Sequence, residues 1–346
     1  MNDKVTIYDI AKKLDITAAT VSRALNDNPK ISKATRLLVM KTAKAMNYKQ
    51  NKLALALKSG KSNNVGVIVP YINRSFFSSI IRGIEDELYP RGYHVIICQT
   101  HETEQKEIDT INTLLNAQVD GILMSVSKFT TNNTHFNRVL NSNIPLIFFD
   151  RRFDMENVNS VTINDYQGGF DATKHLLDQG CKRVAHISGD TTLEIYRNRC
   201  HGYKGALKAA GISFNPDYLI KSKNDIEGGH QAVDELLTLE TPPDAIFSSS
   251  DYVALGAIQR LKEKGYKIPE DFCVVGFSNE PFTQFMELSM STVDQCTVEM
   301  GRTAALVFLE QIKDNTMKIE KKVQLTPQLI IRESSCKKLE KKIKKK

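Results

Sequence analysis

Three absences narrow the class of protein before any motif is considered. The 346 residues contain no apolar run of membrane-spanning length, and residues 1–15 interrupt their apolar positions with lysine and aspartate, unlike a signal peptide. The six cysteines form no Cys-x-x-Cys pair, which argues against zinc or a disulfide framework and favours small buried apolar residues. We therefore expect a cytoplasmic protein with no membrane partner, no metal and no cofactor.

Common enzyme motifs are missing as well. The sequence has no Walker-type glycine-rich loop, no His-Glu-x-x-His and no Gly-x-Ser-x-Gly, and its seven histidines are dispersed. We expect the protein not to be an enzyme. Because one fold can carry many activities, an enzyme stays an alternative that turnover of a candidate sugar would revive.

The charge is unevenly distributed along the chain. Residues 1–60 carry 12 lysines and arginines against 4 acidic residues, and residues 337–346 carry 7 lysines against 1 glutamate, so the formal total of +7 leaves −7 for the residues between. A basic head on an acidic body is typical of a polyanion-binding module joined to an ordinary globular domain. The basic tail, residues 336–346, is expected to be solvated and disordered, with non-specific attraction to DNA as the alternative.

The head has the pattern of three short helices. Thr6 and Asp9 have capping-box spacing, and apolar residues then follow at helical intervals. Thr17 is expected to cap a second helix that ends near Leu25, and Ser32 a third. Small polar residues on the outer face of the second helix suit insertion into the major groove of DNA.

Several motifs occur together in a specific combination. They are Val5-Thr-Ile-Tyr-Asp-Ile-Ala-Lys, Thr20-Val-Ser-Arg-Ala-Leu-Asn26 and residues 32–36 in the head, with Gly202-Tyr-Lys-Gly-Ala-Leu and Ala254-Leu-Gly-Ala in the body. This combination closely resembles the LacI/GalR family of bacterial transcription regulators. The resemblance covers nearly the whole chain and implies a sequence-specific DNA-binding regulator, expected to be a repressor, that a small-molecule effector controls.

The resemblance also implies which residues contact DNA. Ala18 and Ala19 match the specificity positions of the recognition helix, and Arg23 is placed for a base or phosphate contact. Because alanine donates no side-chain hydrogen bond, readout there would rest on thymine methyls, on Arg23 and on groove shape; the alternative is that both alanines simply favour helix. The predicted DNA-binding residues are Thr6, Thr17, Ala18, Ala19, Thr20, Ser22, Arg23, Asn26, Asn51, Ala54, Leu57 and Lys58.

Residues 51–58 could form a short amphipathic helix capped by Asn51. A helix this short is marginal in water, because nucleation costs more than its few hydrogen bonds return, so it should order only against a partner. The resemblance implies that this segment folds on the operator and that Leu57 wedges into the minor groove beside its dimer mate. An inert linker is the alternative.

Beyond residue 62, strand-like apolar runs alternate with helical patterns. The runs cover residues 65–70, 94–99, 121–126, 145–150, 160–164, 183–189, 244–250 and 272–277. This alternation predicts parallel sheets flanked by helices. Glycines with one shared spacing, Gly83 with Gly92 and Gly202 with Gly211, bracket a helix in each half and suggest two similar α/β lobes.

The predicted fold class is an N-terminal all-α helix-turn-helix head followed by a two-lobed α/β sensor domain of the type I periplasmic-binding-protein kind. The expected boundaries are residues 1–50 for the head, 51–62 for the hinge helix and linker, 63–335 for effector binding and dimerisation, and 336–346 for the tail. An exported sugar-binding protein would share the body but would need a signal peptide and would lack the head.

Ligands of open α/β sheets bind beyond the carboxyl ends of the strands. Aromatic rings with carboxylate, guanidinium and amide groups suit a polyhydroxylated ligand, so a carbohydrate effector is expected. The predicted effector-binding residues are Arg74, Phe76, Phe77, Ser125, Asp150, Arg151, Asn164, Arg199, Ser250, Asp251 and Ser278. For each of them an ordinary surface or interlobe salt bridge is the alternative.

By the resemblance, Arg199 and Ser278 match positions that commonly touch effector. Relatives more often carry aspartate in place of Ser278 and asparagine in place of Arg74, which weakens the case for a neutral sugar. Arg74, Arg151 and Arg199 together could instead favour a phosphorylated or acidic sugar.

We expect a homodimer on a palindromic operator, because one head reads one half-site. Effector binding would close or rotate the lobes and change the spacing of the paired hinges, in a direction that stays open. A catabolite-control-type regulator with a protein corepressor is the alternative function.

Overall fold

A computed structural model describes residues 5–49, 61–313 and 320–337. The chain divides into two compact units, a head up to Ser62 and a body from Asn63 onward. Among the described residues, none of the helices combines the length and the apolar character that crossing a membrane requires.

The head is built from α1 (Ile7–Leu14), α2 (Ala18–Leu25) and α3 (Lys33–Ala45). Each helix begins at a residue that the sequence marks as a cap. The Thr6 N–H donates to the Asp9 carboxylate at 2.8 Å, and the Thr17 and Ser32 hydroxyls accept from backbone N–H groups at 3.1 Å. Ile10, Val21 and Val39, one from each helix, are fully buried at the centre.

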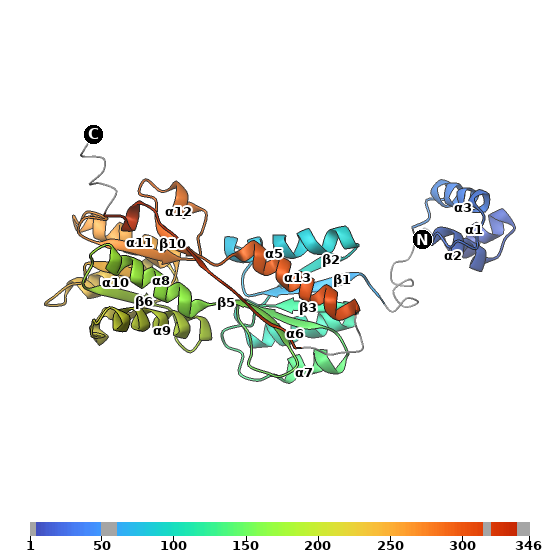
Figure 1. The fold of residues 1–346 in the computed structure, drawn as a ribbon. Helices are drawn as coiled ribbons and strands as arrows, with labels where there is room; N and C mark the ends of the chain where they lie inside the picture. The colour runs from blue at the N-terminus through green and yellow to red at the C-terminus, as the bar shows by residue number, and fades with distance from the viewer. Residues whose placement is uncertain (1–4, 50–60, 314–319, 338–346) are drawn as a thin grey trace. The chain divides into compact units, whose positions relative to one another are not determined.

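The body consists of two lobes, each with a six-stranded sheet (Figure 1). The sheet of lobe 1 has the order β11-β5-β4-β3-β1-β2 and is parallel throughout. Its strands are β1 (Asn64–Val69), β2 (His94–Gln99), β3 (Gly121–Met124), β4 (Leu146–Phe149), β5 (Asn159–Ile163) and β11 (Lys322–Leu325). The helices of lobe 1 are α5 (Ser75–Leu88), η1 (Tyr89–Arg91), α6 (Glu104–Asn116), α7 (Thr134–Asn141) and α13 (Thr297–Lys313).

The sheet of lobe 2 has the equivalent order β12-β10-β9-β8-β6-β7, with only β12 antiparallel to its neighbour. Its strands are β6 (Val184–Ser188), β7 (Leu219–Lys221), β8 (Ala245–Ser248), β9 (Cys273–Phe277), β10 (Ser291–Asp294) and β12 (Gln328–Ile330). Its helices are α8 (Asp165–Asp178), α9 (Glu194–Ala209), η2 (Pro216–Tyr218), α10 (Ile226–Leu237), α11 (Asp251–Glu263), α12 (Phe282–Phe285) and η3 (Glu333–Ser335).

The chain crosses between the lobes three times. The helix that follows β5 packs on α9 in lobe 2, and the helix that follows β10 packs on α5 in lobe 1 (Figure 1). The third crossing joins β11 to β12. Each lobe is therefore completed by a helix that enters it from the other lobe.

The predicted fold class is confirmed, and so are the eight predicted strands to within one or two residues at each end. Four strands were not predicted: β7, β10, β11 and β12. They have only three or four residues each and contain polar residues, whereas the predicted four-residue strands β3, β4 and β8 lie in buried apolar runs. Three of the four, β7, β11 and β12, lie at sheet edges, so no continuous apolar pattern marks them.

The glycine spacing marks two similar lobes, but its interpretation as helix brackets is wrong. Gly83 and Gly202 lie inside α5 and α9, where the helices cross α13 and α8. A Cβ at Gly83 would lie 2.1 Å from the Val298 carbonyl oxygen, and one at Gly202 would lie 2.0 Å from that of Tyr166. Only glycine permits these close crossings, and both lobes use the same device.

Candidate DNA-binding surface and interlobe cavity

The outer face of α2 carries the residues predicted to contact DNA. Ala19 and Arg23 are exposed, whereas Ala18 is half-buried against the head core. Ala19 and Arg23 therefore have more side-chain surface available to contact DNA than Ala18 has. The Thr17 hydroxyl lies 2.9 Å from that of Thr20 and holds the start of the helix.

Two other predicted DNA contacts hold the ends of head helices. The Asn26 amide donates to the Ser22 carbonyl at 2.8 Å at the end of α2. The Thr6 hydroxyl donates to the Asp9 carboxylate at 2.7 Å at the start of α1. Thr6 and Asn26 are exposed and Ser22 is half-buried. The predicted hinge contacts Asn51, Ala54, Leu57 and Lys58 lie outside the described residues.

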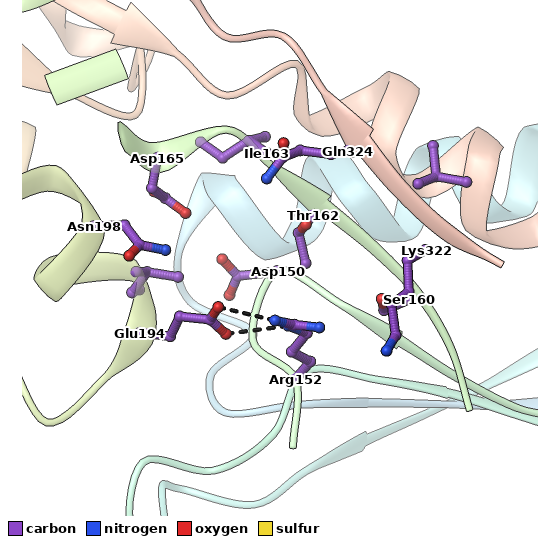
Figure 2. A pocket seen from close by; sticks show the side chains of 12 residues that line it. Asp150, Arg152, Ser160, Thr162, Ile163, Asp165, Glu194, Asn198, Lys322 and Gln324 are labelled. Carbon is purple, nitrogen blue, oxygen red and sulfur yellow. Dashed lines mark hydrogen bonds and ion pairs between the residues drawn. The ribbon is translucent and has the colours of Figure 1, made fainter. Parts of the chain in front are cut away.

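A cavity of about 250 Å³ lies between the two lobes of the body (Figure 2). Lobe 1 contributes residues that follow β4 and residues along β5 and β11, and lobe 2 contributes the first turns of α9. The lining consists of Asp150, Arg152, Ser160, Thr162, Ile163, Asp165, Glu194, Ile195, Asn198, Lys322, Val323 and Gln324. Most of these side chains are carboxylates, hydroxyls and amides, which can satisfy the hydroxyl groups of a ligand.

Asp150 lies at the centre of the cavity in Figure 2. Its backbone turns at a φ of 60°, directly after β4, and its side chain is 8% exposed. The Ser125 hydroxyl donates to the carboxylate at 3.0 Å, and Arg151 Nε lies 3.8 Å away. Burial raises the pKa of Asp150, and the charges of Arg151 and Arg199 oppose the rise.

Arg199 lies behind the cavity and is fully engaged by lobe 2. It lies inside α9, and it donates to Asp165 Oδ1 at 2.7 Å, to the Ser249 carbonyl at 2.9 Å and to Gln295 Oε1 at 3.1 Å. Its guanidinium also lies 3.7 Å from the centroid of the Phe277 ring. Burial raises the pKa of Asp165 to about 6, although Arg199 opposes this rise.

Ser278 is joined to Arg199 through one amide, because Gln295 Nε2 donates to the Ser278 hydroxyl at 2.9 Å. The backbone of Ser278 has a φ of 129°, which is rare for a residue other than glycine. Of the thirteen described non-glycine residues with a positive φ, two are predicted effector residues, Asp150 and Ser278.

The structure thus brings together Asp150, Ser125, Arg151, Arg199 and Ser278 around the cavity. Of these five residues, Asp150 alone lines the cavity directly.

The remaining predicted effector residues have other surroundings. The Arg74 guanidinium lies 4.3 Å from the centroid of the Tyr252 ring, across the cleft between the lobes. Phe77 is buried in the core of lobe 1 with Phe76 packed beside it. The Asn164 side chain caps α8 by accepting from the Gln167 N–H at 3.0 Å.

Asp251 and Ser250 belong to the framework of lobe 2. The Asp251 carboxylate is fully buried and accepts from the Thr292 hydroxyl at 2.6 Å and from the Glu280 N–H at 2.8 Å. Burial raises the pKa of Asp251 to about 7. Ser250 is the residue that precedes α11, and its carbonyl accepts from the Ser248 hydroxyl at 2.8 Å.

Sequence reasoning missed most of the lining. Arg152 and Glu194 pair across the cavity, with N–O distances of 3.0 and 3.1 Å (Figure 2). Lys322 pairs with Ser160 and Gln324 with Thr162 in the register of β11 and β5. The available signal was polar residues alternating with valine, isoleucine and leucine along both strands, but β11 was not predicted.

The chain matches two protein-family models. Residues 6–51 match the bacterial regulatory proteins of the lacI family, and residues 62–333 match the periplasmic binding proteins and sugar binding domain of the LacI family. These matches agree with the resemblance inferred from the motifs.

Curated relatives match over most of their length. The chain is 32% identical over 333 residues to the HTH-type transcriptional repressor PurR of Haemophilus influenzae (strain PittEE), covering 95% of this chain and 98% of the relative. It is 36% identical over 309 residues to the HTH-type transcriptional repressor CytR of Escherichia coli (strain K12), covering 89% and 90%.

Among solved structures, a complex of the transcriptional regulator CelR with cellobiose is similar, with a TM-score of 0.72 and 26% identity. The similarity covers 95% of this chain and 99% of that one.

Proposed function

The chain belongs to the LacI family of bacterial regulatory proteins, whose members are DNA-binding transcriptional repressors under small-molecule control, and from this premise we propose that its effector is a neutral carbohydrate held in the interlobe cavity. On this proposal the protein works in the cytoplasm, as a homodimer on a palindromic operator, and catalyses no reaction.

The composition of the cavity lining carries the proposal. Asp150, Asp165 and Glu194 supply carboxylates, and hydroxyl and amide groups supply most of the other polar atoms. The two cations of the lining, Arg152 and Lys322, are already paired with Glu194 and Glu320. Carboxylate oxygens accept hydrogen bonds from sugar hydroxyls, whereas they repel a phosphate or an acidic sugar. The cellobiose complex of CelR is a precedent for a neutral sugar in a similar chain.

The three arginines that could favour an anionic ligand already have partners. Arg151 donates to both oxygens of Glu102, at 2.7 and 3.0 Å, and Arg199 is paired with Asp165. Arg74 stacks on the Tyr252 ring. An anion that took these cations would leave buried carboxylates without a counter-charge, which is costly.

Ion pairs between the lobes link occupation of the cavity to lobe closure. Arg152 and Lys128 of lobe 1 pair with Glu194 and Asp190 of lobe 2. A ligand that occupied the cavity would alter these cross-lobe contacts and so favour one arrangement of the lobes. Coupling of about 1 to 3 kcal/mol to the heads would be ordinary for such a switch.

Thermal-shift measurements on the full-length protein test the effector class. We expect a neutral sugar, with cellobiose among the first probes, to raise the unfolding temperature, because a ligand that binds only the folded state stabilises it. Asp150→Asn should diminish the shift, whereas Asp234→Asn, which removes one partner of an exposed ion pair, should retain it. Stabilisation by sugar phosphates and by no neutral sugar would contradict the proposal.

Selection from randomised DNA duplexes tests the operator model. The full-length protein should enrich a palindrome, with two half-sites related by the dimer axis. Enrichment of a single asymmetric half-site would contradict the dimeric operator and would leave the effector proposal standing.

A further inference from the structure

The amino-terminal end of α5 lacks a cap from its own lobe. Within residues 74–88, the side chain at the cap position, Arg74, makes no capping hydrogen bond, and the first turn contains no acidic residue. The first turn of every helix has unpaired N–H groups and a partial positive charge, both of which favour a carboxylate nearby. A negative group from another part of the chain would therefore stabilise the start of α5.

Glu280 of lobe 2 supplies a carboxylate at this point. It lies between β9 and α12, and it is only 6% exposed. The hydroxyl of Ser75, the first residue of α5, donates to the Glu280 carboxylate across the cleft between the lobes. A buried carboxylate is costly unless it is hydrogen-bonded, so this contact benefits Glu280 as well as α5.

The backbone of Glu280 is fixed inside lobe 2. Its N–H donates to Asp251 Oδ2 at 2.8 Å, and its carbonyl accepts from the Thr283 hydroxyl at 2.7 Å. Asp251 and Thr283 are both fully buried. Because lobe 2 holds the backbone of Glu280 in place, the bond to Ser75 can form only while the two lobes lie close together at this point.

A second contact joins the same parts of the two lobes. The Arg74 guanidinium lies 4.3 Å from the centroid of the Tyr252 ring on α11, where the ring electrons attract it. The Tyr252 ring packs edge-on against Phe282, with 5.1 Å between the ring centroids. The ion pairs beside the cavity use a different part of lobe 2, the segment that follows β6.

We propose that Ser75 and Glu280, with Arg74 on Tyr252 beside them, form a latch that holds the two lobes in contact when no effector is bound. Separation of the lobes breaks both contacts and leaves the start of α5 without a carboxylate, so the latch favours the arrangement in which the lobes touch. The latch requires no particular effector, and it therefore stands or fails independently of the carbohydrate proposal.

Hydrogen–deuterium exchange of the full-length protein without ligand, read by mass spectrometry, tests the latch. Ser75→Ala removes a donor from lobe 1, and we expect amide exchange in residues 278–286 of lobe 2 to become several-fold faster, because that segment is opened to solvent more often. Ser78→Ala is the matched control. The Ser78 hydroxyl donates to the Ser75 carbonyl at 3.0 Å within α5, so its loss should leave exchange in residues 278–286 unchanged. Unchanged exchange there in Ser75→Ala, or an equal rise in Ser78→Ala, would overturn the latch.

A charge variant tests the part played by the carboxylate. Glu280→Gln keeps the size of the side chain and an acceptor oxygen but removes the charge that favours the start of α5. We expect faster exchange across the cleft, in residues 75–80 of lobe 1, as well as in residues 278–286. Faster exchange confined to residues 278–286 would show that Glu280 acts within lobe 2 alone and would overturn its assignment to the latch.

Discussion

Lobes 1 and 2 share a strand order but use the buried carboxylates at their strand ends in opposite ways. In lobe 2, Asp251 follows β8 with both oxygens occupied by hydrogen bonds from Thr292 and Glu280. In lobe 1, Asp150 follows β4, accepts one side-chain hydrogen bond from Ser125 and faces the cavity. The fully bonded carboxylate holds its own lobe together, and the partly bonded one has acceptor capacity left for a ligand.

The contrast also shows that burial at a strand end does not by itself identify a ligand contact. Asp150 and Asp251 are both aspartates that follow a buried strand, and nothing in the sequence pattern ranks one above the other as a ligand contact. The hydrogen bonds distinguish them, because both oxygens of Asp251 are occupied whereas Asp150 accepts one side-chain hydrogen bond.

The largest effect should come from the buried ion pair of lobe 2. Arg199→Ala leaves the Asp165 carboxylate buried without its cation, which should cost about 3 to 5 kcal/mol of unfolding free energy in urea titrations. Arg260→Ala, at a partly exposed ion pair between α11 and α10, is the matched control and should have a much smaller effect. Equal losses in the two variants would show that Arg199 is not a buried anchor of lobe 2.

The next largest effect concerns how the free energy of unfolding depends on pH through Asp251 of lobe 2. The pKa of Asp251 is about 7 in the folded state and lower in the unfolded state, so the folded protein binds the proton more tightly. The contribution of Asp251 to stability is therefore present in full below about pH 4 and falls as pH rises to about 7, by at most about 1.4 kcal/mol per pH unit.

Asp251→Asn should remove this slope from unfolding free energies measured between those pH values. An unchanged slope would show that the Asp251 carboxylate does not carry a proton in the folded state.

The third effect should fall on ligand affinity rather than on stability. Asp150→Asn keeps the size of the side chain but weakens it as an acceptor, and we expect about a tenfold loss of effector affinity, equivalent to about 1.4 kcal/mol. Isothermal titration calorimetry with the sugar identified by thermal shift measures this loss. Intact affinity together with a large loss of stability would reverse the ranking of Asp150 and Asp251.

The smallest effect concerns the pair that joins the lobes across the cavity. Glu194→Gln weakens the contact with Arg152, a partly exposed pair that contributes about 0.2 to 1 kcal/mol. Effector affinity should change by less than about fivefold and should depend less on salt concentration than in the wild type. Titrations at low and high ionic strength check this, and an unaltered salt dependence would remove the pair from the closing contacts.

Much of the framework could be predicted because local patterns determine it. The Thr17 and Ser32 caps and the eight predicted strands each depend on residues within one short window of sequence. The two-lobed arrangement followed from a repeated glycine spacing, even though Gly83 and Gly202 turned out to lie at helix crossings. A crossing glycine and a bracketing glycine look alike until the partner helix is known.

The cavity could not be predicted, because distant segments create it. Lys322 meets Ser160 only through the pairing of β11 with β5, and Glu194 meets Arg152 only where the lobes face each other. Sequence periodicity gives the face on which a side chain lies, but tertiary packing decides which residue it contacts.

The exchange of helices between the lobes has a consequence for synthesis on the ribosome. Lobe 1 emerges first, but it lacks α13 and β11 until residue 325 has been made. Its helix α5 and its strand β5 therefore have no packing partner while β6 to β10 are translated. Chains fold as they emerge, and exposed apolar faces and strand edges invite aggregation. The nascent protein is therefore most in need of chaperone protection while its amino-terminal lobe is unfinished.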